Sequence, residues 1–387
     1  EWIVAGIQLV LGAGHTLEAS YSQATRLLSQ ASSGFHECGD TFGEAMSRLW
    51  QCLVWYRSGD STRLRRDIAD SLQLIQTHGY SFIFQRPVLL GPPDPRALVP
   101  LLIFARDHHS QTVYAEQMLS ELGLSAVETH PGYQLRVQTL GQFRLWHGRE
   151  ELSGKVWKRK KARQLFQFLL THRGQMVHRD QIIELLWPDL PPDGAVRDFK
   201  IAFSGMCNVL EPERTRNAPS AYIARDGSRY GLRPTADLWL DTAEFEATIH
   251  EGNRLYVADP QAVRPYYEQA LSLYEGDFLQ AYPYEVWSDE ERNRLRLLFL
   301  RTAERVAQTC MAQKAWEETI AICHDILAAD DCWETAYQMM MTAYHQMGNR
   351  TQALRTYQQC VTALQAGLGV EPTAVTTHLY QNLTEPA

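Results

Sequence analysis

The side chains in this sequence that are best suited to a chemical role are cations. They lie beside and within a stretch whose apolar residues recur at helical spacing. Four of them are consecutive, namely Lys158, Arg159, Lys160 and Lys161. They stand at the predicted start of a helix, where positive charge opposes the helix dipole. We therefore expect this cluster to contact phosphate or a neighbouring subunit, with a solvated helix start as the alternative.

A second set of polar residues has the spacing of side chains that read DNA bases. A helix predicted to start near Gly194 has as its polar or small positions Arg197, Lys200, Ser204, Cys207 and Asn208. Arginine and lysine in such positions can reach guanine, and asparagine can reach adenine or a phosphate. His178 and Arg179 open the preceding predicted helix, whose backbone N–H groups can also meet a phosphate.

Two further arginines flank a predicted hairpin turn. Asp226-Gly227 separates the extended stretches Tyr222–Ala224 and Tyr230–Leu232, which is a strong hairpin signal. Arg225 and Arg229 lie on either side of this turn and could enter a minor groove. Ordinary decoration of a hairpin is the alternative interpretation.

The elements that would position these cations lie between residues 135 and 237. Apolar residues recur at helical spacing in three blocks between Trp157 and Pro212, and prolines at 188, 191 and 192 separate the second block from the third. A strand is predicted over Leu135–Leu145 before the blocks, and the hairpin of Tyr222–Leu232 follows them. Strands, three helices and a closing hairpin describe a winged helix-turn-helix.

The same stretch resembles the OmpR-type winged helix of the bacterial antibiotic-regulatory-protein class of transcriptional activators. The matching pieces are Leu140-Gly141-x-Phe143, Trp157-Lys158-x-x-Lys161-Ala162-Arg163, Gly174-x-x-Val177-x-Arg179-Asp180, Leu185-Leu186-Trp187-Pro188 and Leu210-Glu211-Pro212. Further pieces resemble the bacterial transcriptional activator domain, a helical repeat module: Tyr274-x-Gly276-Asp277-Phe278-Leu279, Trp287-x-x-x-x-Arg292 and Leu368-Gly369-Val370-Glu371-Pro372.

The resemblance implies one role and one discrepancy. It implies that the loop Pro188–Asp193 contacts RNA polymerase, with Asp189 and Asp193 as its charged contacts; a simple connection, with Asp193 or a neighbour capping the next helix, is the alternative. It also leads us to expect arginines around positions 205, 207 and 208, where this chain has Gly205, Cys207 and Asn208. The affinity for specific bases could then be weak, or the sequence preference could differ; the alternative is that this helix no longer reads DNA.

Charge is distributed unevenly along the chain, as expected if one part of the chain contacts DNA. The whole chain has a formal net charge of −8, but residues 135–237 carry 18 Lys and Arg against 11 Asp and Glu. Residues 1–134 carry 9 against 13, and residues 238–387 carry 10 against 21. A basic middle between acidic ends is typical of one nucleic-acid-binding domain flanked by protein-facing ones.

Helical repeats are predicted on both sides of the basic middle. Residues 1–124 read as tetratricopeptide-like helix pairs with turns about 20 residues apart at Gly39-Asp40 and Gly59-Asp60, and residues 125–134 read as a linker. Residues 238–387 open with Asp241 as the predicted N-cap of a capping box. Their pattern around Trp316 recurs 34 residues later, with Tyr357 in the second copy, and we expect both aromatic side chains to be buried.

Other classes of protein find little support in the sequence. The seven cysteines are scattered, which favours free thiols in a reducing cytoplasm. No apolar run approaches the length of a membrane span, and no catalytic, metal-binding or P-loop motif occurs, so we expect neither an enzyme nor a cofactor. Because the chain starts at Glu1 and not at Met, we expect an upstream regulatory domain to be missing.

The sequence therefore predicts a mainly α protein in which tetratricopeptide-like helical repeats flank an OmpR-type winged helix-turn-helix (α+β), over residues 1–124, 135–237 and 238–387. The expected function is that of a cytoplasmic transcriptional activator. The expected partners are double-stranded DNA, RNA polymerase holoenzyme and, as a further option, a second copy in a homodimer. The alternative is a protein-interaction scaffold with a vestigial winged helix.

Overall fold

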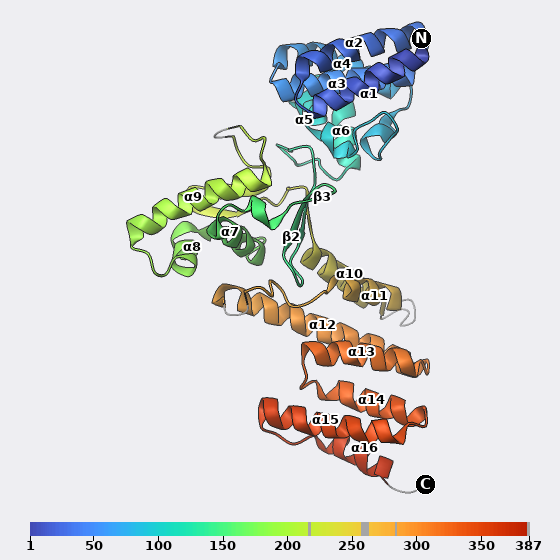
Figure 1. Ribbon diagram of the computed structural model, residues 1–387, viewed down its shortest axis with the longest axis vertical. Helices are drawn as coiled ribbons and strands as arrows, with labels where there is room; N and C mark the ends of the chain where they lie inside the picture. Colours follow the sequence, from blue (N-terminus) through green and yellow to red (C-terminus); the bar gives the residue numbers. More distant parts are fainter. Residues whose placement is uncertain (216–217, 257–262, 283–284, 385–387) are drawn as a thin grey trace. The chain divides into compact units, whose positions relative to one another are not determined.

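The structure is a computed structural model that describes residues 1–387 except 216–217, 257–262, 283–284 and 385–387 (Figure 1). The chain is mainly helical and forms two compact units. Unit 1 comprises Glu1–Arg136 and Leu145–Leu238, and unit 2 comprises Val137–Arg144 and Trp239–Ala387. No helix in the described part of the chain is both long enough and apolar enough to cross a bilayer.

Unit 1 begins with helix pairs. They are α1 (Trp2–Leu17), α2 (Tyr21–Glu37), α3 (Thr41–Ser58), α4 (Ser61–Thr77), α5 (Val99–Asp107) and α6 (Thr112–Glu121), with short 3₁₀ turns η1 (Ser81–Phe84) and η2 (Pro95–Leu98) before α5. The predicted Gly-Asp turns explain the pairing, because Gly59 takes a left-handed φ of 76° and Asp60 then accepts the backbone N–H of Arg63 to cap α4. The apolar run Ile3–Leu11 lies in α1.

The rest of unit 1 contains the three predicted helices and the hairpin. The helices are α7 (Lys160–Thr171), α8 (Arg179–Leu186) and α9 (Pro192–Leu210), after a 3₁₀ turn η3 (Gly154–Val156). Strands β4 (Val177–His178), β5 (Ile223–Asp226) and β6 (Arg229–Leu232) form a sheet in the order β4-β6-β5. A second sheet, with residues from both units, has the order β3-β2-β1-β7, from β1 (Leu135–Gln138), β2 (Arg144–His147), β3 (Glu150–Glu151) and β7 (Leu238–Leu240).

Two predicted boundaries differ in detail from those of the structure, and the backbone explains both. The single strand predicted over Leu135–Leu145 is two strands, because the chain turns near Gly141, which adopts a φ of 93° that L side chains rarely take. The third helix starts at Pro192 and not near Gly194, since proline is preorganised for the first helical position. The residue that precedes α9 is Pro191, which forms no side-chain cap, so the alternative of a cap by Asp193 or a neighbour is wrong.

Aromatic packing fixes the hairpin against α9. Tyr230 on β6 packs edge-on against Phe199 and Phe203 of α9, with ring centroids 5.0 and 5.1 Å apart. Phe199 also meets Trp187, which follows α8, at 6.1 Å. Helices α8 and α9 and the hairpin therefore share one apolar core.

Residues 125–134, predicted as a linker, are hydrogen-bonded into unit 1. The hydroxyl of Tyr133 donates to the carbonyl of Leu210, the last residue of α9, at 2.8 Å, and Tyr133 stacks on His147 at 4.3 Å. The hydroxyl of Tyr222 donates in turn to the carbonyl of Tyr133 at 2.8 Å. The segment thus contacts both the end of α9 and the start of the hairpin.

A buried carboxylate, Asp237, ties the helical segment to the same region. It accepts hydrogen bonds from Arg96 Nε at 2.5 Å, His130 Nε2 at 3.2 Å and Gln134 Nε2 at 2.8 Å. His130 Nδ1 accepts the backbone N–H of Gly132 at 3.0 Å, so Nε2 of this fully buried imidazole carries the proton that faces Asp237. Burial alone would raise the pKa of Asp237, but the bonds from His130 and Arg96 outweigh it and lower the pKa.

Unit 2 is a stack of helices. They are α10 (Asp241–Tyr256), α11 (Arg264–Leu273), α12 (Val286–Ala312), α13 (Trp316–Ala329), α14 (Glu334–Gln346), α15 (Arg350–Leu368) and α16 (Ala374–Thr384). The 34-residue repeat is visible in the burial, since Thr319 and Ile326 on α13 correspond to Ala353 and Cys360 on α15 and all four are buried.

The two aromatic side chains of the repeat, Trp316 and Tyr357, are both partly buried, in keeping with the expected burial, and Tyr357 stacks on Tyr380 of α16 with centroids 4.0 Å apart. One prediction within unit 2 was wrong. Asp241 is the first residue of α10 and not the residue before it. Its buried carboxylate holds the segment around Thr139, accepting Thr139 N at 2.6 Å, Thr139 Oγ1 at 2.7 Å and Leu140 N at 2.6 Å.

Candidate nucleic-acid interface

Helix α9 presents a largely polar face to solvent, which also includes the apolar Ile201, 40% exposed. Four of the predicted base-reading residues are exposed on it, namely Arg197, Lys200, Ser204 and Asn208. Their spacing of three and four residues places them on one side of the helix, while Ala195, Phe199, Ala202, Met206 and Leu210 are buried on the other. Neither Arg197 nor Lys200 forms a salt bridge within the described residues, so both cations are available to a ligand.

The resemblance-based expectation of arginines at 205, 207 and 208 can now be examined position by position. Cys207 is buried, which raises the pKa of its thiol to about 12, so its place among the candidate reading positions was wrong. A Cβ on Gly205 would lie 3.5 Å from the Cβ of Ala162, so this position faces α7. Of the three positions, Asn208 alone is exposed and free to contact a base.

An acidic residue that was predicted for another role shares the face of α9. Asp193 lies in the first turn of α9, exposed, four residues before Arg197. This i,i+4 spacing was the sequence signal that could have placed it on the same face. Asp189, the other predicted polymerase contact, is exposed in the turn between α8 and α9.

The four consecutive cations Lys158–Lys161 lie in different environments. Lys158, Arg159 and Lys160 are exposed, and Arg159 Nη1 lies 3.7 Å from Asp198 Oδ1 on α9. The ammonium of Lys161 donates to the carbonyl of Leu186 at the end of α8 and lies 5.5 Å from the centroid of the Trp187 ring. A cation at a helix C-terminus is stabilising, so Lys161 serves the packing of α7 on α8.

Asp198 is a residue of this region that sequence reasoning missed. Its Oδ2 accepts Trp187 Nε1 at 2.6 Å, and its Oδ1 faces Arg159. The contact joins the start of α7, the end of α8 and the middle of α9. A partnership across three elements leaves no local sequence signal, which is why the pattern did not reveal it.

The start of α8 is internally capped. His178 Nδ1 accepts the backbone N–H of Asp180 at 3.3 Å, and Gln181 Oε1 accepts the backbone N–H of His178 at 3.4 Å. Arg179 directs its Nε and Nη2 to Asp180 Oδ1 at 3.1 and 3.0 Å. A phosphate at this helix end would therefore compete with contacts that both predicted residues already make.

The hairpin places two arginines near α9. Arg225 Nε donates to the carbonyl of Gly227 at 3.2 Å, and the Arg225 guanidinium lies 5.6 Å from the centroid of the Tyr230 ring. Arg229 is exposed on the other strand, paired with Asp226 in the register of the sheet. Because Tyr230 packs on Phe199 and Phe203, the hairpin and α9 are held as one surface.

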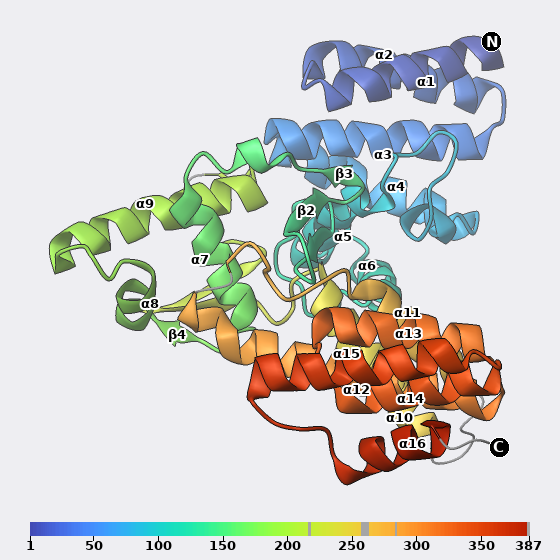
Figure 2. The ribbon, with the colours of Figure 1, turned by 60° about the horizontal axis from the view of Figure 1, so that its bottom comes forward.

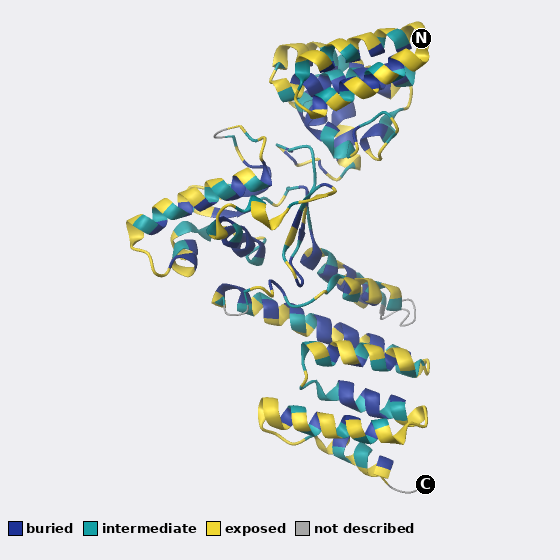
Figure 3. Ribbon diagram, in the orientation of Figure 1, coloured by how far each residue is buried: buried dark blue, intermediate teal, exposed yellow. Residues whose placement is uncertain are grey.

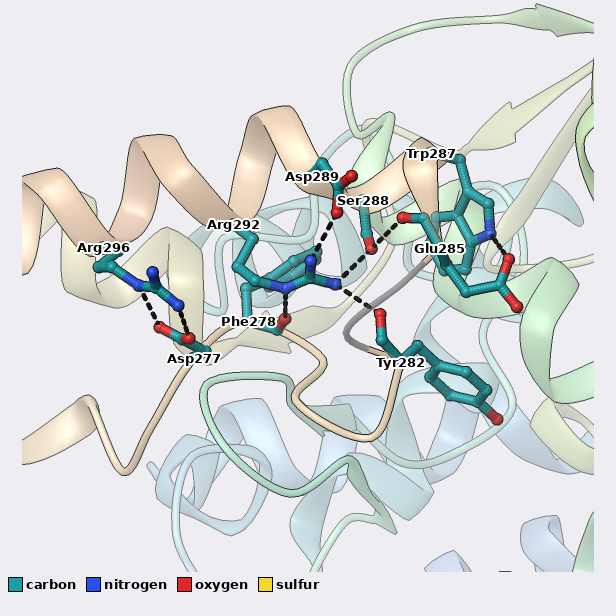
Figure 4. Close-up of polar contacts among 9 residues, drawn as sticks. All are labelled: Asp277, Phe278, Tyr282, Glu285, Trp287, Ser288, Asp289, Arg292 and Arg296. Carbon is teal, nitrogen blue, oxygen red and sulfur yellow. Dashed lines mark hydrogen bonds and ion pairs between the residues drawn. The ribbon is translucent and has the colours of Figure 1, made fainter. Parts of the chain in front are cut away.

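In unit 2, by contrast, the pieces that resemble the activator domain serve the fold (Figure 4). Arg292 on α12 is buried and donates to the carbonyls of Phe278 at 3.1 Å and Tyr282 at 2.7 Å, and to Ser288 Oγ at 2.7 Å. Arg296 Nε donates to Asp277 Oδ1 at 2.9 Å. These arginines fasten the extended segment around Phe278 to α12.

Comparison with known proteins finds similarity over part of the chain. Residues 240–384 match the model of the bacterial transcriptional activator domain. The chain is 25% identical over 250 residues to the regulatory protein AfsR of Streptomyces griseus, covering 64% of this chain and 24% of that protein. It is also 25% identical over 264 residues to AfsR of Streptomyces coelicolor, covering 68% and 25%.

A solved structure shares the fold. Mycobacterium tuberculosis EmbR, solved in complex with a low-affinity phosphopeptide, aligns with a TM-score of 0.53 and 20% sequence identity over 66% of each chain. At this identity the likeness concerns the fold alone. The chain spans about a quarter of the length of the AfsR proteins that it matches.

Proposed function

We propose that this chain is a transcriptional regulator that binds double-stranded DNA through residues 135–237, folded as a winged helix, with α9 in the major groove and the β5–β6 hairpin as the wing. The observation that carries the proposal is the exposed polar face of α9. It presents Arg197, Lys200, Ser204 and Asn208 opposite the core of the helix. A helix of this kind, packed on a second helix, is the element that helix-turn-helix proteins insert into the groove.

The side chains divide between two tasks in this proposal. Arg197 and Lys200 lie in the N-terminal half of α9 and have the donors that recognise guanine. Lys158, Lys160 and Arg229 contact phosphates, which positions the helix without reading sequence. Lys161 is left out, because its ammonium is committed to the carbonyl of Leu186.

The activating step is proposed to use the turn between α8 and α9 and the activator domain. Asp189 is exposed in that turn beside Leu190, whose side chain is 44% exposed. A charged and an apolar side chain on a short exposed turn suit a protein partner, and RNA polymerase holoenzyme is the partner that a promoter-bound regulator meets.

The second candidate function is a protein-interaction scaffold that has lost DNA reading. It is favoured by Asp193, whose negative charge lies on the same face of α9 as Arg197 and opposes a phosphate backbone. Gly205 and Cys207, neither of which offers a donor to a base, favour it as well. The DNA-binding regulator and the scaffold can be distinguished by measuring how the affinity of the chain for DNA depends on salt.

The test is a titration of DNA affinity against salt by fluorescence anisotropy. For a phosphate-contacting protein, the logarithm of affinity falls linearly with the logarithm of salt concentration, and each lost phosphate contact reduces the slope by about 0.9. We expect Lys158→Ala to reduce the slope and Arg26→Ala, a change of an exposed arginine on α2, to leave it unchanged. An equal slope for the wild type, Lys158→Ala and Arg26→Ala would show that Lys158 does not contact the DNA. An absence of DNA binding by the wild type would favour the protein-interaction scaffold.

A further inference from the structure

One large side chain on the exposed face of α9 is apolar. Ile201 is 40% exposed, whereas the other exposed residues of α9 are polar or proline (Figure 3). A single exposed isoleucine is ordinary on a protein surface, so its place among its neighbours decides what it can do.

Ile201 lies within a row of the proposed base-reading residues. Arg197, Ile201, Ser204 and Asn208 follow one another at steps of four, three and four residues, which aligns them along the helix. We call these four residues the reading row. The buried residues of α9 lie on its other side, and α7 and α8 both pack on one side of α9 (Figure 2). The reading row is therefore turned away from the core.

The stability of the helix gives no reason for an isoleucine in the reading row. A β-branched side chain loses rotamer freedom in a helix, so a straight polar side chain such as lysine or glutamine is favoured at an exposed helical position. The exposed part of Ile201 also keeps apolar surface in water, which contact with an apolar group would remove. Ile201 therefore suits a ligand that presents an apolar group at this place in the row.

DNA of the four ordinary bases has one apolar group in its major groove. Every base pair presents donors or acceptors there, and thymine adds its 5-methyl group. Arg197 and Asn208, at the two ends of the reading row, have the donors that meet guanine and adenine. We propose that Ile201, between them, reads thymine by packing its side chain against the 5-methyl group.

The spacing along α9 sets where this thymine lies. Ile201 follows Arg197 by four residues, which is a rise of about 6 Å along the helix. Successive base pairs are about 3.4 Å apart. For a helix that follows the groove, the thymine therefore lies roughly two base pairs from the guanine that Arg197 contacts.

The thymine contact rests on the proposed function of α9 as a helix that reads DNA. The two fail in different ways, because a chain that selects no sequence has neither, whereas a chain that selects a sequence but ignores the methyl group lacks only the thymine contact. A protein partner that covers Ile201 is the other use of an exposed apolar side chain, and it would make substitution of Ile201 silent in DNA binding.

The test compares thymine with uracil, which lacks only the 5-methyl group. Duplexes that the full chain enriches from a randomised pool are synthesised with each thymine replaced in turn by uracil, and their affinity is measured by fluorescence anisotropy. We expect one replacement to weaken wild-type binding about fourfold, as the loss of one buried methyl group does, and the others to leave it unchanged. The sensitive thymine should lie roughly two base pairs from the guanine whose preference depends on Arg197.

Two variants assign the effect to its side chain. Ile201→Gln suits a helix but has no apolar branch, so it should bind the thymine and uracil duplexes alike, about fourfold more weakly than the wild type binds the thymine duplex. Val113→Gln on α6 is the control, because Val113 is 82% exposed and lies outside the reading row, and it should keep the full sensitivity to the methyl group. Circular dichroism of both variants checks that the fold is kept.

Three results would overturn the thymine contact while leaving DNA binding in place. They are an enriched motif without thymine, a wild type that binds every uracil duplex as tightly as the thymine duplex, and an Ile201→Gln variant that keeps the wild-type sensitivity to the methyl group. An Ile201→Gln variant with unchanged affinity would assign Ile201 to a protein partner instead. A wild type that enriches no motif would overturn base reading by α9 and the thymine contact together.

Discussion

The buried carboxylate of Asp237 gives the sharpest test of how the helical segment is joined to the hairpin region. Its side chain is 7% exposed and accepts three hydrogen bonds, from Arg96, His130 and Gln134. Asp237→Asn keeps the size of the side chain, but it removes the charge and turns an NH₂ group toward these donors. Removal of one partner of a buried pair costs about 3–5 kcal/mol.

Partial hydration lowers the expected cost. The side chain of Arg96 is 34% exposed and can recover water, whereas His130 is fully buried and would keep an unsatisfied N–H at a cost of about 1–3 kcal/mol. We therefore expect Asp237→Asn to lower the free energy of unfolding of unit 1 by about 3 kcal/mol. The control is Asp107→Asn, which breaks an exposed pair with Arg106 and should cost below about 1 kcal/mol.

The assay is denaturant unfolding with the two units followed as separate transitions, at neutral and at acidic pH. The folded-state pKa of Asp237 is lowered from its ordinary value of 3.8, so its stabilisation is present above that value and is lost as the pH falls through the folded pKa. The difference between wild type and Asp237→Asn should accordingly shrink in acid. A difference below about 0.5 kcal/mol at neutral pH would refute the inferred network.

Three further substitutions follow from local geometry. Gly205→Ala should raise the free energy of unfolding by about 0.5–1 kcal/mol, because glycine weakens a helix interior and the structure has room for the Cβ; a loss of stability in denaturant melts would contradict this. Gly231→Ala should lower it by about 2 kcal/mol or more, since the Cβ would collide with the carbonyl of Gln175. Lys161→Ala should lower stability by about 1 kcal/mol through loss of its bond to Leu186, and should leave the salt dependence of DNA binding unchanged; a reduced salt slope would return this lysine to the interface.

The local patterns of the sequence predicted where the helices lie, but they did not predict which residues of different elements contact one another. Apolar spacing located α7, α8 and α9, and the Asp226-Gly227 turn located the hairpin, because period and turn chemistry are encoded in neighbouring residues. Cys207 was misplaced, since a small residue can lie on either face of a helix.

Contacts between distant residues were beyond the reach of those patterns. The bond from Lys161 to the end of α8, the partnership of Asp198 with Trp187, and the hold of Asp241 on Thr139 all join different elements. Such polar pairs satisfy one another only after the elements have packed, so their spacing in the sequence carries no period. The exposed face of α9 was predictable, because solvent exposure of a packed helix follows from where its apolar residues lie.

The most direct test of the central claim is a binding selection on randomised duplexes, carried out with the wild-type chain and with Arg197→Ala. A bidentate contact between arginine and guanine discriminates by about 1–3 kcal/mol, whereas a phosphate contact carries no sequence information. We predict that the wild type enriches a motif containing guanine and that Arg197→Ala relaxes the preference at that position while still binding DNA. A wild type that enriches no motif, together with equal binding by Arg197→Ala, would contradict the reading of bases by α9 and would favour the scaffold.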